Sequence, residues 1–571
     1  MTLFTKPLHL GTLFDDLAAR GSATAVHLSR PLDIAPGLGT ELDVPRVAEL
    51  VREAAGWLAA AGVRPGDRVA IAKRNHWDYV LLNCAAARLG AVPASLSAHL
   101  EPDALEVLLK RLDPALLVTD AALLAASRNA GADPAVHAAR TLVIDGPAGA
   151  EGPVGGGGGG GGGGPVGDTL PIGDRVPVGG GGPAGSVLHL DDVRGNDAPP
   201  PRRPHLDAPL AIMHTSGTTG VPKLVPHSTR TIMRRLAGFE AHRWPVLGSR
   251  PDDTVTGAYS FAHGRALAWT ASVLWLSPGA LSVVTWADWA EAGPLLERHR
   301  PTTLEAAPAV FARWQGRAGR EGAPFDRVRL YVSTFDAVHP PTVRAFLGAT
   351  GHRRPVWMQG WGQSETGPLT FRFLTRRALA AESERHPTTR DLGRPIPTRT
   401  RLRAVDPRTM RPVPAGTPGL IFCRTEALCL GYVGEEGRWR SKLVGEWWNT
   451  GDIGVLSRTG ALRLVDREVD ALREGGCLEV EDVVDDRLPE VLECVVLSVP
   501  DGPPVPVVAT ESGGLDIMAW RGAVADLPEL ADPVAMTWDE LPRTGTGKVR
   551  RSVLRDHLGL RPDTCGTGKW T

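Results

Sequence analysis

A run of hydroxyl and glycine residues at positions 214–223 is the part of this sequence best suited to bind a polyphosphate. It reads His-Thr-Ser-Gly-Thr-Thr-Gly-Val-Pro-Lys. Glycines allow close backbone approach to phosphate oxygens, hydroxyls donate to them, and the lysine adds a positive charge. The P-loop pattern does not fit, because Pro222 stands where its last glycine should be. The residues expected to bind nucleotide here are Thr215, Ser216, Gly217, Thr218, Thr219, Gly220 and Lys223.

Five further segments follow this run, and together with it they resemble the motifs of the adenylate-forming superfamily. That superfamily contains acyl-CoA synthetases, peptide-synthetase adenylation domains and luciferases. The resemblance implies that a carboxylate attacks the α-phosphorus of MgATP, pyrophosphate leaves and an acyl-adenylate remains. The five segments are 259–264, 359–366, 448–452, 466–470 and 541–548.

Segment 359–366 resembles the family pattern Q-x-Y-G-x-T-E, with Trp361 for tyrosine and Ser364 for threonine. The indole would offer adenine a flat apolar face, and the serine hydroxyl would bond the α-phosphate. Glu365 is a hard oxygen ligand suited to a Mg²⁺ ion shared with ATP phosphates, and it is expected to take part in catalysis. The nucleotide-binding residues expected in this segment are Gly360, Trp361, Gly362 and Ser364.

Four residues in the other segments take their expected roles from the resemblance. Asp452 is expected to accept hydrogen bonds from the ribose hydroxyls, and Arg467, beside the hinge between two domains, is expected to contact the nucleotide. Lys548 is expected to swing into a closed site and neutralise charge on the carboxylate and α-phosphate. His263 is expected to line the carboxylate pocket and gate the acceptor tunnel, although a histidine on an apolar turn is more often structural.

The elements that must position these segments follow an α/β order near the N-terminus. Helical spacing of apolar residues covers 44–61, and a strand-like run covers 68–72. A second helical stretch ends at about Arg88 and is followed by apolar residues 91–93. This order predicts a layered α/β fold with parallel strands. Residues 62–71 also resemble the superfamily.

The length of 571 residues predicts at least two folding units. With the resemblance, we expect a large N-terminal domain of layered α/β subdomains over 1–465. A small, mobile α+β domain over 466–571 would carry the lysine loop. Within the large domain, residues 146–185 are rich in glycine and proline and include ten consecutive glycines. Such a tract cannot bury enough surface to offset its ordering entropy, so we expect a disordered insertion.

Replacing Gly155–Gly164 with a short Gly/Ser linker is therefore expected to leave the melting temperature and the adenylation rate nearly unchanged. Differential scanning fluorimetry and pyrophosphate release would measure the two quantities. A large loss of activity without unfolding would show that the tract takes part in the site.

Composition favours a cytoplasmic enzyme. The 63 basic and 64 acidic residues balance, which gives no electrostatic argument for a nucleic-acid or membrane partner. The six cysteines form no C-x-x-C pair, which is typical of reduced thiols. The N-terminus has no basic region followed by an apolar stretch, so no signal peptide is expected. The apolar stretch 266–284 is interrupted by polar residues, Pro and Gly, and is more typical of a core than of a membrane span.

Two departures from the family pattern leave the acceptor open. Val469 stands where the family has a hinge aspartate or lysine, and the stretch 481–548 is short for the family. In addition, segment 331–337 matches the family's Gly-Gly-Ala adenine wall only weakly, because it lacks both glycines. The first hypothesis is transfer to CoA, or to the phosphopantetheine of an acyl-carrier protein.

Two other hypotheses remain. The acceptor could be an amine, as in amide-forming relatives, or the chain could be an inactive nucleotide-binding scaffold. The retention of catalytic residues such as Lys548 argues against a scaffold. The small-molecule carboxylic acid is not readable from the sequence. Four tryptophans lie in the segment expected to supply part of its pocket, although a core role is the more common one. They are Trp269, Trp275, Trp286 and Trp289.

Overall fold

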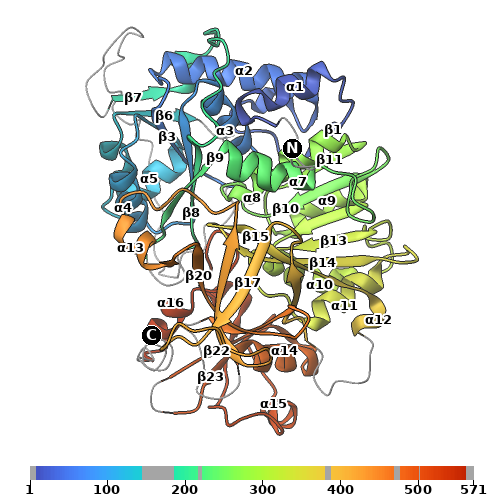
Figure 1. The fold of residues 1–571 in the computed structure, drawn as a ribbon. Helices are drawn as coiled ribbons and strands as arrows, with labels where there is room; N and C mark the ends of the chain where they lie inside the picture. Colours follow the sequence, from blue (N-terminus) through green and yellow to red (C-terminus); the bar gives the residue numbers. More distant parts are fainter. Residues whose placement is uncertain are drawn as a thin grey trace, which may run out of the picture.

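The computed structural model describes residues 8–144, 186–216, 221–379, 388–467, 476–499 and 502–560. Three β-sheets organise these residues (Figure 1). The glycine-rich segment 146–185, residues 217–220 of the phosphate loop and Val469 lie outside the described residues.

The first sheet has seven strands in the order β7-β6-β5-β3-β4-β8-β9. Its neighbouring strands are parallel except for the antiparallel β8–β9 pair. Its central strands are buried along nearly their whole length, as expected for a parallel sheet covered on both faces. The strands are β3 (Arg68–Lys73), β4 (Val92–Ser97), β5 (Leu116–Asp120), β6 (Arg140–Ile144), β7 (Ser186–His189), β8 (Pro209–His214) and β9 (Leu224–Ser228). The helical segments in this part of the chain are α2 (Val44–Ala60), α3 (Asp78–Arg88), α4 (Pro102–Leu112), α5 (Ala121–Asn129), η3 (Pro134–His137) and α6 (Leu190–Val193).

The elements predicted near the N-terminus are confirmed. The helix expected over 44–61 is α2, and the strand expected over 68–72 is β3, which pairs in parallel with β4. Asp43 caps α2, because its side chain accepts a hydrogen bond from the Arg46 N–H at 2.8 Å. The structure is therefore of the expected α/β class.

The second sheet has fourteen strands and joins a parallel half to an antiparallel half. Its order is β17-β18-β20-β21-β16-β15-β14-β13-β12-β10-β11-β1-β2, with β19 on β20. Strands β14 to β1 in this order are parallel, and β15 to β17 pair antiparallel. The strands are β1 (Ala25–Leu28), β2 (Glu41–Asp43), β10 (Thr254–Ala258), β11 (Ala280–Val284), β12 (Thr303–Ala306), β13 (Leu330–Ser333), β14 (Val356–Gln363), β15 (Gly367–Leu374), β16 (Asp391–Pro395), β17 (Thr400–Val405), β18 (Pro418–Thr425), β19 (Leu443–Val444), β20 (Trp447–Leu456) and β21 (Leu462–Arg467).

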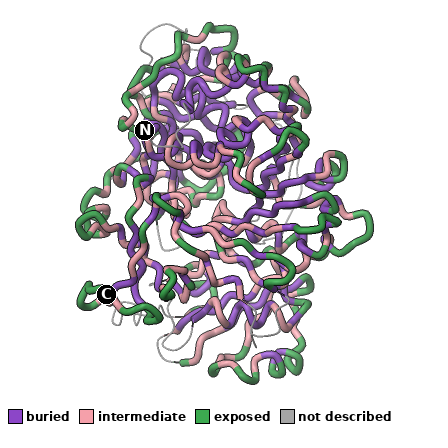
Figure 2. Tube along the Cα trace, turned by 45° about the vertical axis from the view of Figure 1, so that its right-hand side comes forward, coloured by how far each residue is buried: buried purple, intermediate pink, exposed green. Residues whose placement is uncertain are grey.

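The remaining helical segments before the C-terminal region belong with this sheet or join it to the first. They are η1 (Leu10–Thr12), α1 (Leu13–Ala19), η2 (Pro36–Leu38), η4 (Thr229–Ala237), α7 (Gly238–Glu240), α8 (Gly264–Leu276), α9 (Trp289–His299), α10 (Pro308–Ala318), α11 (Pro340–Ala349), α12 (Arg376–Leu379) and α13 (Glu436–Ser441). Residues of α2, α3 and α8 share one buried cluster, so these helices form a common core. Figure 2 shows buried residues filling the interior and exposed residues gathered at the outer loops.

The third sheet is small and lies at the bottom of Figure 1. It contains β22 (Val491–Leu497), β23 (Val505–Thr510) and β24 (Val534–Thr537), accompanied by α14 (Cys477–Arg487), α15 (Ile517–Val524), η5 (Trp538–Glu540) and α16 (Arg551–His557). β21 is the last strand of the second sheet in chain order and ends at Arg467, and the third sheet has its own core clusters. We therefore propose a domain boundary near the end of β21, with domains 1–465 and 466–571. Within the described residues, no helix is both long enough and apolar enough to cross a membrane.

Candidate functional site

A cavity of about 420 Å³ brings together most of the residues predicted from the sequence. Its walls come from the β8–β9 hairpin, the start of α8, strands β13, β14 and β20, and the C-terminal lysine loop. The predicted residues that line it are Thr215, Ser216, Lys223, His263, Gly360, Gly362, Ser364, Glu365, Arg467 and Lys548. Two described residues from the prediction, Trp361 and Asp452, do not line it.

The phosphate run forms the connection between β8 and β9. The Thr215 N–H donates to the Lys223 carbonyl at 3.0 Å, and the Lys223 N–H donates to Thr215 Oγ1 at 3.1 Å. The two ends of the loop are therefore held together. Lys223 Nζ lies 5.4 Å from the centre of the Tyr432 ring. Burial lowers the pKa of Lys223, while the Glu365 charge opposes that shift.

Glu365 is held in the turn between β14 and β15. Its Oε1 accepts a hydrogen bond from the Tyr432 hydroxyl at 2.6 Å. Burial raises the pKa of Tyr432 well above its ordinary value, so this hydroxyl stays protonated. No described residue donates to Glu365 Oε2, which leaves that oxygen available to a cation. A single carboxylate oxygen facing a phosphate-binding cavity fits Mg²⁺, which takes few protein ligands beside phosphates and water.

The cavity is strongly cationic around Glu365. A triphosphate could be neutralised there by several side chains from different elements. These cations are Lys223, Arg438, Lys442, Arg467 and Lys548.

The indole of Trp361 lies on the opposite face of β14 from the cavity. Side chains alternate along a strand, so Met358, Gly360 and Gly362 face the cavity while Trp361 faces away. Trp361 is 8% exposed and packs in a cluster with Trp448. Trp361 therefore does not line the cavity, where the wall is glycine, and its contact with adenine stays a prediction.

Trp361 instead contacts Asp452. Its Nε1 donates to Asp452 Oδ2 at 3.2 Å, and Arg467 Nε donates to Asp452 Oδ1 at 3.2 Å. Asp452 is 5% exposed and is held from both sides. This arrangement orients Arg467, which lines the cavity.

The glycines beside Lys548 allow its loop to pack against the large sheets. A Cβ on Gly545 would lie 2.2 Å from Ser97 Oγ at the end of β4. Gly547 has a φ of +85°, and a Cβ there would lie 2.9 Å from the Cβ of Ala309. Burial lowers the pKa of Lys548, while Asp336 and Asp452 oppose that shift.

His263 caps α8 and lies where two cavities meet. Its Nδ1 accepts from the Arg265 N–H at 3.1 Å, and its Nε2 lies 3.4 Å from Ser364 Oγ. Burial lowers the pKa of His263 to about 3, so the ring is neutral at pH 7 with its proton on Nε2. His263 also lines a second cavity of about 370 Å³, whose walls include His99 and the lysine loop.

Several residues of the cavity were missed from the sequence. Phe335 lies in the segment that lacks the family glycines, and its φ of +85° is a conformation that glycine adopts readily. Its ring packs edge-on against His263 at a centroid distance of 4.8 Å. Trp269, in contrast, is 1% exposed in the core, which agrees with the core role favoured from the sequence. Other missed lining residues include Ile232, Leu236, Glu240, Arg265, Ala268, Val332, Met358 and Phe371.

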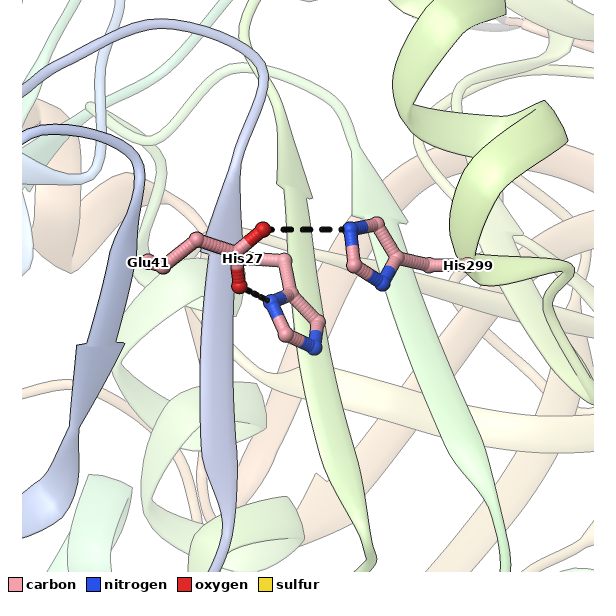
Figure 3. A group of neighbouring side chains, drawn as sticks. All are labelled: His27, Glu41 and His299. Carbon is pink, nitrogen blue, oxygen red and sulfur yellow. Dashed lines mark hydrogen bonds and ion pairs between the residues drawn. The ribbon is translucent and has the colours of Figure 1, made fainter.

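A cluster of metal-ligand type lies away from this cavity, at the edge of the second sheet (Figure 3). Both Glu41 oxygens point to imidazoles, with Oε2 paired to His27 Nδ1 and Oε1 3.4 Å from His299 Nε2. The two imidazoles stack at 3.7 Å with an interplanar angle of 15°. The lone pairs of parallel rings do not converge on one ion, because each lies in its own ring plane. In this arrangement the cluster ties β1 and β2 to the end of α9.

The cavity places several cations beside apolar side chains within an α/β fold. A model of the AMP-binding enzyme family matches residues 18–433. The chain belongs to this family of adenylate-forming enzymes.

Of three similar proteins, two are named diazotases and one is named a CoA ligase. The chain is 37% identical over 564 residues to the 3-amino-2-hydroxy-4-methoxybenzoate diazotase of Streptomyces cremeus, covering 98% of this chain and 97% of that protein. It is 24% identical to the 3-aminoavenalumate diazotase of a Streptomyces species, covering 91% and 90%. The crystal structure of the anthranilate CoA ligase AuaEII with anthranoyl-AMP superposes with a TM-score of 0.72 at 22% identity, covering 97% of each chain.

Proposed function

We propose that this protein is an ATP-dependent, AMP-forming diazotase, which uses nitrite to convert an aromatic amine into an aryl diazonium ion. The observation that carries the proposal is the similarity to the Streptomyces cremeus diazotase along nearly the full length of both chains. It shifts the preference from a thiol acceptor to an amine. The second hypothesis from the sequence also had an amine acceptor, but for an acyl group and not for a nitroso group.

The reaction uses the same cationic cavity as carboxylate activation. An oxygen of nitrite attacks the α-phosphorus of ATP, and pyrophosphate leaves with the electrons of the broken P–O bond. The amine nitrogen then attacks the nitroso nitrogen, the N–O bond breaks, and AMP leaves with that electron pair. The amine loses one proton to give the N-nitrosamine, and proton transfer within the N-nitrosamine gives the diazohydroxide. One proton added to the hydroxyl of the diazohydroxide then lets water leave, which gives the diazonium ion. Nitrite, like a carboxylate, is an anionic oxygen nucleophile, so it can occupy the same position.

The residues take roles that follow from their geometry. Lys223 and the β8–β9 connection hold the phosphates, and Lys548 neutralises charge that builds on the α-phosphate. Arg467 contacts the nucleotide, and Asp452, which Trp361 holds from the other side, orients Arg467. Hydrogen bonds from Asp452 to the ribose hydroxyls stay a prediction. The neutral His263 offers its Nε2–H at the junction of the two cavities.

Glu365 would hold a Mg²⁺ ion, which when bound shields the phosphate charge. Its free Oε2, facing the same cavity as the cations, supports this role.

A second candidate is an acid–thiol ligase that transfers an acyl group to CoA or to the phosphopantetheine of a carrier protein. The observation that favours it is the second cavity, which reaches His263 between β4 and the lysine loop and offers a thiol a route to the adenylate.

The two candidates are separated by supplying the purified full chain with ATP and Mg²⁺ and either nitrite or CoA. A panel of aminohydroxybenzoates serves as substrate, and AMP, pyrophosphate and product masses are measured. With ¹⁵N-nitrite, we expect an azo dye that carries the label after coupling to a naphthol, formed only with ATP and the enzyme. AMP release that needs CoA and yields a thioester, with no labelled dye, would overturn the diazotase proposal in favour of the ligase.

A further inference from the structure

A group of three charged side chains borders the cavity apart from the phosphate-binding cations. Glu240 is the last residue of α7, Arg265 lies in the first turn of α8, and Glu305 lies on β12. Glu240 and Arg265 line the cavity, whereas Glu305 lies behind them. The charges that act most strongly on Arg265 are those of Glu240 and Glu305. Those that act on Lys223 come from other residues, so this group is separate from the phosphate-binding cations.

Arg265 is fixed by both glutamates. Its Nε and Nη2 donate to the two oxygens of Glu305 at 2.6 and 2.8 Å, which is a bidentate pair. Its Nη1 donates to Glu240 Oε2 at 2.5 Å. Ser272 Oγ also lies 3.4 Å from Glu240 Oε2. The contacts from Arg265 and Ser272 both fall on Oε2 of Glu240, and they hold its carboxylate in a single orientation.

The other oxygen, Glu240 Oε1, accepts no hydrogen bond from any described residue. The Glu240 side chain is 20% exposed, compared with 3% for Glu305. Glu240 borders this cavity and a smaller neighbouring pocket, whereas Glu305 lines neither.

The cavity wall makes it energetically unfavourable to leave this Glu240 oxygen without a hydrogen-bond donor. The neighbouring cavity wall is apolar and includes Leu236, Ala268 and Phe371. A carboxylate oxygen in such a wall interacts strongly with any hydrogen-bond donor that displaces its water.

The charge balance decides which ligand the cluster accepts. Two carboxylates face one guanidinium, so the cluster carries a net charge of about −1 when both glutamates are ionised. Arg399 also interacts with Glu240, but it interacts more strongly with Glu426, so it does not cancel the negative charge of the cluster. A substrate carboxylate would be repelled here, and an N–H or O–H group would be attracted.

We propose that Glu240 is the specificity-determining residue of the substrate pocket and accepts a hydrogen bond from an amino or phenolic hydroxyl group on an aromatic substrate. Arg265 is a positioning residue that orients the carboxylate, and Glu305 neutralises Arg265 from behind. The inference deepens the proposed function, since it names the ring substituent that this same cavity selects. It also holds for a ligase of such a ring, because it concerns binding alone.

The test measures binding without turnover. Dissociation constants are determined by calorimetry for four probes in the presence of α,β-methylene-ATP and without nitrite or CoA. The probes are 3-amino-4-hydroxybenzoate, 3-amino-4-methoxybenzoate, 4-hydroxy-3-methylbenzoate and 4-methoxy-3-methylbenzoate. The second and third each remove one donor, and the fourth removes both. The parent protein is expected to bind the first probe about 10- to 100-fold more tightly than the fourth.

Glu240→Leu is expected to abolish this difference by weakening the first probe while leaving the fourth nearly unchanged. Glu240→Gln keeps an acceptor oxygen and the size of the side chain, so it should retain part of the difference even if the leucine variant folds poorly. Ser272→Ala is the matched control, because it removes a contact to Oε2 and leaves Oε1 in place; it should retain the full difference.

Three outcomes would overturn the proposal. They are failure of the parent to bind the first probe, equal affinity of the parent for the first and fourth probes, and an undiminished difference in the glutamine and leucine variants. Because no probe is converted, a failed diazotase assay leaves this result unaffected, and the two proposals can fail separately. The second and third probes show which donor, amine or hydroxyl, Glu240 binds.

Discussion

Lys548→Ala is expected to lower the rate of adenylate formation about 100-fold or more, which is typical for loss of a charge-stabilising donor. Lys548 reaches the cavity from a loop that two glycines seat against the large sheets. Its charge lies where the α-phosphate is expected, whereas the body of the nucleotide would contact other residues. The maximal rate should therefore fall much more than the affinity for ATP.

ATP–pyrophosphate exchange measures this step directly, and nucleotide titration by calorimetry measures binding. Lys110→Ala is a matched control, because Lys110 lies on α4 with its side chain 57% exposed and, among the described residues, pairs with Glu106 alone at the surface. The assignment fails if Lys548→Ala reduces exchange no more than Lys110→Ala does, or if the loss is explained by ATP affinity alone.

Glu365→Gln is expected to reduce exchange by about 100-fold and to raise the Mg²⁺ concentration that gives half-maximal rate. Glutamine keeps an oxygen that can accept from the Tyr432 hydroxyl, so the fold of the turn should persist. Only the negative charge and the second carboxylate oxygen are lost. A Mg²⁺ titration of the exchange rate checks the prediction.

Tyr432→Phe is the companion variant, since it removes the hydroxyl that orients Glu365 and leaves the carboxylate itself. Its effect on the half-maximal Mg²⁺ concentration should be smaller, about 10-fold, as for loss of a residue that orients a metal ligand. An unchanged Mg²⁺ dependence in Glu365→Gln would remove Glu365 from the metal site.

The local parts of the site were readable from the sequence because their chemistry depends on adjacent residues. The run 214–223 and the lysine loop each place glycines beside polar groups within a few positions, and residues 44–60 show the spacing of a helix. The structure places Ser216 and Lys548 on one cavity, as a shared nucleotide site requires. The acceptor could not be read in this way, since no local run of residues defines it.

The remaining features depend on backbone direction and on distant strands. Trp361 was assigned to adenine from its place in a motif, but strand alternation turns its indole to the opposite face. Phe335 takes a left-handed backbone that its residue type does not predict.

By itself, the sequence determined the family and the parallel α/β start of the chain. It also predicted phosphate binding by the run 214–223 and a catalytic role for Lys548, because short-range spacing and residue type are enough for these predictions. Only the tertiary structure placed Glu240 and Arg265 together on the cavity where we propose that the substrate binds. Glu240 and Arg265 are 25 residues apart, and Arg265 and Glu305 are 40 apart. Their charges act together because packing of α7, α8 and β12 brings the three groups into hydrogen-bonding distance, which no local pattern records.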